Sequence, residues 1–311
     1  MIDYFIYIFI FLLLIFLHKF QYKLPYLPKD NPNKIQSTNE IKNTLLLNLL
    51  IFLPILFRYF EIIFIVPLLI VFVIGLLDDL YNLSVIKRFF LVGIVVTFLL
   101  IINDGFYLSK FIIYNIYINL NFYFGVILSL FLILGFIHVM NMSDGRNGLV
   151  VSYLLLITIY LSLKNEFNFF HIEIIISLVL ILYLNMKNIS YLGNNGLLVL
   201  SIFFGTLMFK YYNEDMIYIR EVFILFFIPF YDGIYVTIKR LFIRKNLFEP
   251  DKNHLHHLVP NSKWNYSLLI ILIIKILPLI FLNLFPFLNF IYFFMYSLLG
   301  YIFLRLLFNK I

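Results

Sequence analysis

The stretch IIFIVPLLIVFVIGLLDD, from Ile62 to Asp79, joins a long apolar run directly to two carboxylates. A helix over such a run crosses most of the roughly 30 Å of hydrocarbon in a bilayer. Acidic side chains cost about 2–3 kcal/mol each inside a membrane, so a pair needs either water or a partner. The pair therefore either marks the end of a transmembrane helix or belongs to a site there. At a helix end that faces water, such a pair can hold a divalent cation beside phosphate oxygens.

The composition predicts an all-α integral membrane protein. The chain has 311 residues, of which 63% are hydrophobic and 13% are charged, and its mean hydropathy is +1.01. A soluble domain could not bury so much apolar surface. Cysteine is absent, which excludes disulfides and thiolate metal sites. The net charge of +7 lies mainly in loops between apolar runs and does not indicate nucleic-acid binding.

We predict about 10–11 transmembrane helices in one polytopic domain, residues 1–311. The first run has no small-residue cleavage site after it and is interpreted as a retained span. The run 44–57 is the least regular, because Pro54 and Arg58 allow a shorter interfacial segment. The segment 103–123 alternates enough to predict a small hairpin or a surface-lying segment. The apolar runs fall near 2–17, 44–57, 62–77, 89–102, 124–140, 148–163, 168–185, 197–211, 217–236, 266–283 and 286–308.

The distribution of positive charge predicts an external N-terminus and a cytoplasmic C-terminus. In that orientation most Lys and Arg residues lie in inner segments. The outer side keeps Arg58, Lys110, Lys164, Lys210 and Arg220. The inner segments are 18–43, 78–88, 141–147, 186–196 and 237–265, and the last four carry polar clusters. We therefore expect an active site on the cytoplasmic face.

The first two of these clusters each contain at least one carboxylate. Asp78 and Asp79 are followed by Asn82 and by Lys87-Arg88, a combination that suits Mg²⁺ and phosphate. The second cluster is NMSDGRNGL, residues 141–149. Its glycines let the backbone approach a ligand, while Asp and Asn offer oxygens and amides. An ordinary turn between two helices explains the second cluster equally well.

The other two clusters follow later in the chain. YLGNNG, residues 191–196, is also consistent with a simple helix cap and turn. The last cluster comprises PFYDG (229–233), Lys239-Arg240 and EPDKNHLHH (249–257). Three histidines there could bind Zn²⁺, but His, Arg and Lys are better suited to a diphosphate. Asp232 is costly within a span, and we expect it to pair with Arg240. His18, His138 and His171 are isolated in the sequence.

In this order and on one face, the clusters resemble the motifs of the polyprenyl-phosphate N-acetylhexosamine-1-phosphate transferases (glycosyltransferase family 4), in their WecA-like branch. Residues 78–82 resemble the family's DDxxN motif, and residues 141–149 resemble its NxxDGxxGL loop. Residues 191–196 resemble FxGDxG, and residues 229–257 resemble PxxD…R…DxxHxHH. HLHH after EPD favours this branch over the peptidoglycan-precursor translocases, which have adjacent histidines.

The resemblance implies a reaction. A UDP-activated N-acetyl amino sugar would give its sugar-1-phosphate to undecaprenyl phosphate, with release of UMP. The cofactor would be Mg²⁺, with Mn²⁺ as an alternative. The protein would lie in a bacterial inner membrane as a multi-pass protein and start a surface glycan such as O-antigen or teichoic acid. Its partners would be the two substrates and membrane lipids, and a homodimer is compatible with the family.

The resemblance also implies roles for residues. Asp78 and Asp79 would position and deprotonate the lipid phosphate, and Asp144 would line the nucleotide and metal site. The implied catalytic residues are Asp78, Asp79, Asp144, His254, His256 and His257. The implied substrate-binding residues are Asn82, Lys87, Arg88, Asn141, Asn147, Asp232 and Arg240. The implied metal ligands are Asp79, Asp144 and Asn194.

Three departures from the family pattern leave alternatives open. The first inner loop keeps only a trace of its motif in residues 30–33, and Asn147 replaces a second Asp. Asn194 replaces the metal-ligating Asp, and an amide oxygen binds Mg²⁺ more weakly than a carboxylate does. A catalytically diverged, lipid-phosphate-binding relative is one alternative. A transporter is another, although only Glu173 and Lys275 fall well inside spans.

Overall fold

The structure is a computed structural model that describes residues 47–113, 116–164, 168–244, 253–285 and 290–309. The predicted span 2–17 and the first inner segment, 18–43, lie outside the described residues. The statements below refer to the described part of the chain.

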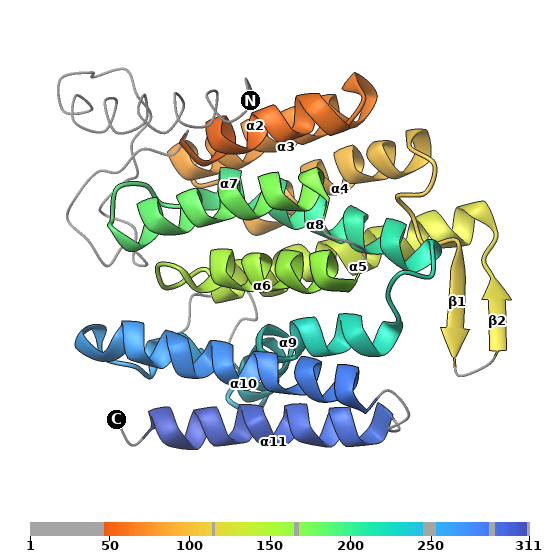
Figure 1. Cartoon of the computed structure of the whole chain (residues 1–311). Coiled ribbons are helices and arrows are strands. Elements are labelled where there is room, and N and C mark those ends of the chain that lie inside the picture. The colour runs from red at the N-terminus through yellow and green to blue at the C-terminus, as the bar shows by residue number, and fades with distance from the viewer. Residues whose placement is uncertain (1–46, 114–115, 165–167, 245–252, 286–289, 310–311) are drawn as a thin grey trace.

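The described chain is a bundle of α-helices (Figure 1). Eight of its helices are long and apolar enough to cross a membrane, and α6 is a shorter apolar helix. The prediction of an all-α integral membrane protein is confirmed. Which end of the bundle faces the cytoplasm stays a prediction. The helices are α2 (Leu47–Tyr59), α3 (Ile62–Tyr81), α4 (Val85–Ile102), α5 (Phe122–Ser143), α6 (Leu149–Lys164), α7 (Phe169–Met186), α8 (Gly193–Asn213), α9 (Ile219–Phe242), α10 (Trp264–Leu284) and α11 (Phe290–Phe308).

Several helices extend beyond the apolar runs into the polar clusters. Helix α3 continues through Asp78 and Asp79 and ends at Asn82, whose φ of 53° lies in the left-handed region. Asparagine enters this region more readily than most residues. Helix α8 begins at Gly193, before the apolar run, so Asn194 and Asn195 lie in its first turn. The polar motifs are therefore held on helix ends and not only on loops.

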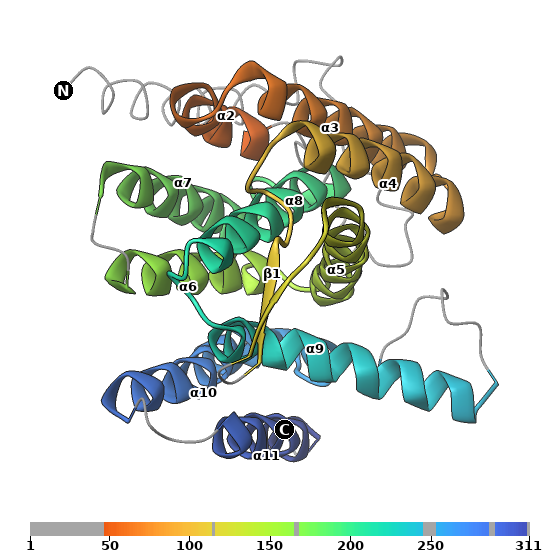
Figure 2. The same cartoon turned by 90° about the vertical axis from the view of Figure 1, so that its right-hand side faces the viewer.

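A hairpin lies at the end of the bundle opposite the polar clusters (Figures 1 and 2). Strand β1 (Lys110–Ile113) pairs antiparallel with β2 (Ile116–Asn119), with Lys110 opposite Asn119. Asp215, which follows α8, accepts a bond of 2.6 Å from Lys110 Nζ. The prediction of a hairpin within 103–123 is confirmed.

Helix α8 lies at the centre of the bundle and is packed between α3 and α5 (Figure 2). Within its most hydrophobic stretch 89% of the residues are buried, against 28% for α4 and for α5. Gly75 of α3 permits a close approach to α8, because a Cβ there would lie 2.5 Å from the Cα of Asn195. This approach brings the C-terminal part of α3 against the first turn of α8.

Glu173 and Lys275, the two residues that bear on the transporter alternative, both lie within described helices. Glu173 of α7 forms an ion pair of 3.0 Å with Arg58, so it is compensated. Lys275 of α10 is fully buried, and its Nζ lies 3.7 Å from the centroid of the Tyr153 ring. No hydrogen-bond partner for this Nζ is present among the described residues. The Glu173–Arg58 ion pair and Lys275 do not form a continuous polar path across the bundle for a transported substrate. This disfavours the transporter alternative.

Candidate active site

Asp79 connects the end of α3 to the start of α8. Its Oδ1 accepts hydrogen bonds from the backbone N–H (3.2 Å) and the side-chain Nδ2 (3.0 Å) of Asn194. Its Oδ2 accepts a bond of 3.2 Å from the backbone N–H of Asn195. The N-terminal end of a helix carries a partial positive charge that favours an anion. The first turn of α8 therefore stabilises the charged form of this buried carboxylate.

Asp78 is held by a cation from α4. Arg88 Nη1 lies 2.6 Å from Asp78 Oδ2 and 3.5 Å from Asn194 Oδ1. The first and third polar clusters of the sequence are thus joined directly. Asn82 and Lys87 are both exposed, beyond the end of α3 and in the first turn of α4 respectively.

Asn194 uses both ends of its side-chain amide in this arrangement. Nδ2 donates to Asp79, while Oδ1 accepts from Arg88. An aspartate at this position would have no hydrogen to donate and would repel Asp79. The amide oxygen has two lone pairs, so its contact with Arg88 does not by itself prevent metal binding. Metal ligation by Asn194 stays a prediction.

Asp144 follows α5 directly, and its backbone N–H donates to the carbonyl oxygen of Asn141. Asp144 is a solvent-exposed residue, yet the surrounding protein desolvates its carboxyl group. This desolvation, followed by the negative charge of Asp79, raises the pKa of Asp144 to about 8. The influence of Asp79 indicates that the carboxylates of the first and second clusters lie in one electrostatic environment.

The loop after Asp144 is fixed by contacts with later parts of the chain. Trp264 Nε1 donates a bond of 2.8 Å to the backbone oxygen of Asn147. The Arg146 guanidinium lies over the Trp264 ring and donates to the backbone oxygen of Val259 (2.6 Å). The side chain of Asn147 donates to Asn188 at 2.6 Å. The Asn147 amide is thus engaged with the loop that precedes α8.

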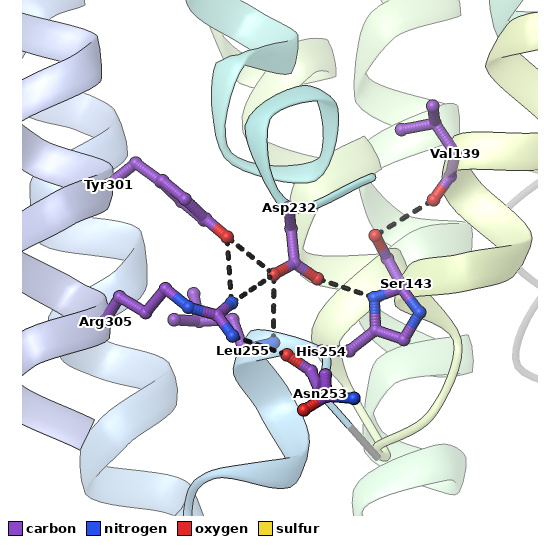
Figure 3. A network of polar contacts seen from close by, with 8 residues as sticks. All are labelled: Val139, Ser143, Asp232, Asn253, His254, Leu255, Tyr301 and Arg305. Atoms are coloured by element: carbon purple, nitrogen blue, oxygen red, sulfur yellow. Dashed lines mark hydrogen bonds and ion pairs between the residues drawn. The ribbon is translucent and has the colours of Figure 1, made fainter. Parts of the chain in front are cut away.

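Asp232 of α9 organises the loop that carries three histidines, residues 253–257, which we call the histidine loop (Figure 3). Its Oδ2 lies 2.9 Å from His254 Nδ1. Its Oδ1 accepts bonds from the Leu255 N–H (3.0 Å), the Tyr301 hydroxyl (3.0 Å) and Arg305 Nη1 (3.3 Å). Arg305 is a cationic partner of Asp232 that we did not predict, while the predicted pairing of Asp232 with Arg240 stays a prediction. Helix α11 packs against α9 and carries Arg305 to the carboxylate.

His256 joins the histidine loop to the second cluster. Its ring is buried and lies against Gly145, where a Cβ would be only 1.9 Å from Nε2. It stacks parallel to His254 with ring centroids 5.6 Å apart, and the His257 centroid is 4.2 Å away. Burial, followed by the nearby charges of His257, His254 and Arg146, lowers the pKa of His256 well below its usual value. His256 is therefore neutral at neutral pH in the ligand-free protein.

The comparisons with known proteins agree with this geometry. Residues 61–213 match the family model described as glycosyl transferase family 4. This region of the chain, residues 61–213, belongs to glycosyl transferase family 4. It is 25% identical over 206 residues to the undecaprenyl-phosphate alpha-N-acetylglucosaminyl 1-phosphate transferase of Thermotoga maritima. The alignment covers 65% of this chain and spans 62% of the length of that relative.

The family 4 region contains the acidic half of the site. It includes Asp78, Asp79, Asp144 and Asn194 but ends before Asp232 and the histidine loop. Within the described residues no group of three or more His, Cys, Asp or Glu side chains could hold a metal. However, Mg²⁺ in phosphate sites commonly has one or two carboxylates, with the remaining ligands from phosphate and water. Asp79 and Asp144 therefore fit an Mg²⁺ ion that is completed by substrate.

The structure adds residues that the sequence did not single out. His138 lies three residues before Asn141 in α5, and together with Arg88 these side chains line one open pocket. The helical spacing of His138 and Asn141 is a signal that sequence reasoning could have used. Tyr301, Arg305 and Trp264 come from helices far away in the sequence, and no local pattern connects them to the motifs. The predicted roles of the other site residues stay predictions.

Proposed function

We propose that this protein transfers an N-acetyl amino sugar-1-phosphate from a UDP-sugar to undecaprenyl phosphate. An oxygen of the lipid phosphate would bond to the sugar-linked phosphorus, and the diphosphate bridge would break to release UMP. The product would be a lipid-linked diphosphate sugar that starts a surface glycan such as O-antigen or teichoic acid. The main support is that four separate polar clusters meet at one end of an apolar bundle.

Two contacts carry this argument. The Asp79–Asn194 hydrogen bonds join the first and third clusters, and the Gly145–His256 contact joins the second and fourth. The charge of Asp79 also acts on Asp144. A lipid phosphate from the bilayer and a soluble nucleotide can meet only at the membrane boundary. Clusters gathered at helix ends satisfy that requirement.

The acceptor, undecaprenyl phosphate, would bind between α4, α5 and α8. A pocket there has apolar walls, and its polar side chains are Arg88, His138 and Asn141. Its lining consists of Val85, Arg88, Phe89, Val92, Leu134, Ile137, His138, Asn141 and Leu198. Apolar walls suit an isoprenoid chain, and Arg88 with His138 suits its phosphate. Asp78, bonded to Arg88, would then lie beside the attacking oxygen.

The donor would occupy the space between the acidic residues and the histidine loop. Asp79 and Asp144 would hold Mg²⁺, or Mn²⁺, which neutralises charge on the diphosphate when it is bound. His254, His257 and Arg146 surround the stacked ring of His256 and would bind phosphate oxygens. Neutral His256 would support these side chains by packing. The negative charge of the leaving UMP would thus face cationic groups from two loops.

UMP release by the purified protein tests the proposed function. The protein would be incubated with Mg²⁺, undecaprenyl phosphate and a panel of UDP-N-acetyl amino sugars. We expect UMP with at least one donor and none from Asp78→Asn, which removes the charge paired with Arg88. Failure of every donor with folded wild-type protein would sink the proposal.

Asn194 supports a second candidate function, a lipid-phosphate-binding relative without turnover. Its amide occupies the place between Asp79 and Arg88, where a carboxylate would strengthen a metal site. This candidate is favoured if wild-type protein binds undecaprenyl phosphate but releases no UMP. It gains further support if Asn194→Asp creates activity.

We predict that Asp144→Asn stabilises the metal-free protein at pH 8 and abolishes stabilisation by Mg²⁺. The pKa of Asp144 is raised in the folded state, so its ionisation opposes folding. The metal-free wild type should therefore lose stability as the pH rises from about 4 through about 8. The measurement is the Tm in detergent with EDTA or with Mg²⁺, at pH 6 and pH 8. Equal effects of Mg²⁺ on the variant and the wild type would contradict the prediction.

A further inference from the structure

Helix α11 lies outside the family 4 region, yet it reaches the centre of the polar network in Figure 3. Tyr301 and Arg305 are four residues apart, so they lie on one face of the helix. The Tyr301 hydroxyl donates to Asp232 at 3.0 Å, and Arg305 Nη1 lies 3.0 Å from the same hydroxyl. Both side chains are therefore directed towards one carboxylate.

Asp232 in turn determines the orientation of the His254 ring. A carboxylate offers only lone pairs, so the 2.9 Å contact requires that His254 Nδ1 carries the hydrogen. The neutral ring then has an unprotonated Nε2, and the protonated ring has an Nε2–H. In both states Nε2 is the nitrogen that remains available to a ligand.

Arg305 also holds the loop that carries His254. Its Nη2 donates a bond of 2.8 Å to the backbone oxygen of Asn253. The guanidinium lies 3.4 Å from the centroid of the Tyr235 ring, which fixes its plane. The same side chain bonds Asp232 at 3.3 Å. One guanidinium thus connects α9, α11 and the histidine loop.

We propose that Tyr301 and Arg305 are positioning residues for the transfer. They fix Asp232, and through it they fix the His254 ring with Nε2 directed to the diphosphate. This inference rests on the proposed function. Groups that orient a ligating or catalytic histidine typically change activity by about 10–100-fold when they are removed. The proposal extends the site to a helix beyond the family 4 region.

Turnover of matched variants tests the proposal. Tyr301→Phe removes one hydroxyl and keeps the ring, and we expect a kcat lower by about 10-fold with little change in KM for the lipid. Arg305→Gln should lower kcat by about 100-fold. Tyr292→Phe is the control, because Tyr292 is exposed on the same helix. Wild-type kcat in folded Tyr301→Phe and Arg305→Gln would overturn the proposal.

Histidine NMR gives a readout that does not depend on turnover. The chain contains six histidines, and the ¹⁵N signals of His254 are assigned by their loss in His254→Gln. We expect the Nδ1–H tautomer in the wild type and a mixture of tautomers in Tyr301→Phe. An Nε2–H tautomer in the wild type would overturn the proposal. If the wild type releases no UMP, the proposed function fails, and the tautomer alone decides whether α11 orients His254.

Discussion

Replacing Gly145 with alanine should lower the rate of UMP release about 100-fold without preventing folding. The new Cβ would lie 1.9 Å from His256 Nε2 and 2.6 Å from its Cδ2, so the imidazole has to move. His256 stacks on His254, and the displacement passes to the ring that Asp232 holds. A displacement of about 1 Å in a catalytic arrangement can cost about 100-fold in rate.

Gly135→Ala is the matched control for this substitution. Both glycines are near or within α5, but a Cβ at Gly135 meets nothing within 4 Å. Alanine in a helix is favoured over glycine by about 1 kcal/mol, so the control should be at least as stable as the wild type. UMP release and Tm would be measured for both variants. Normal turnover by Gly145→Ala would show that the His256 contact is unimportant.

Replacing Gly75 with alanine should reduce both stability and activity. The Cβ would lie 2.5 Å from the Cα and 2.7 Å from the backbone nitrogen of Asn195. Backbone atoms cannot rotate away, so α3 and α8 must separate. Overpacking of this kind costs about 1–3 kcal/mol. The separation would also lengthen the hydrogen bonds between Asp79 and the first turn of α8 and lower turnover by about 100-fold.

Tm and UMP release of Gly75→Ala would be compared with those of Gly93→Ala. Gly93 lies in α4, and a Cβ there meets only the Leu134 side chain, at 3.8 Å. This control changes a transmembrane glycine without a close helix contact. If Gly75→Ala melts and turns over like the control, the close packing of α3 on α8 does not hold the site together.

The length of the apolar runs in the sequence predicted most of the fold. Each described α-helix corresponds to a predicted apolar run, because hydrocarbon requires that the backbone groups of a span bond within it. The predicted helix ends were less accurate. Helix α8 begins at Gly193 and not at 197, and α9 extends to Phe242 and not to 236. Polar residues at these ends look like loops in a hydropathy pattern, whereas capping and local hydrogen bonds keep them helical.

Motif order predicted which clusters would meet but not how the side chains pair. We expected Arg240 to pair with Asp232, which stays a prediction, but we did not expect Arg305, which α11 brings to the same carboxylate. The same limit applies to Asn194, whose amide donates to Asp79. Such pairings depend on the packing of helices that are far apart in the chain, and no local pattern records them.

Helix α8 has a consequence for the making of the protein. Its mean hydropathy of 1.2 is the lowest of the eight candidate spans, so lipid alone would attract it weakly during translation. Helices α3 and α5, which shield it, precede it in the chain. When α8 leaves the ribosome, the helices that cover it are already synthesised. The order of the segments thus suits the order of synthesis, and the least apolar helix arrives last among these three.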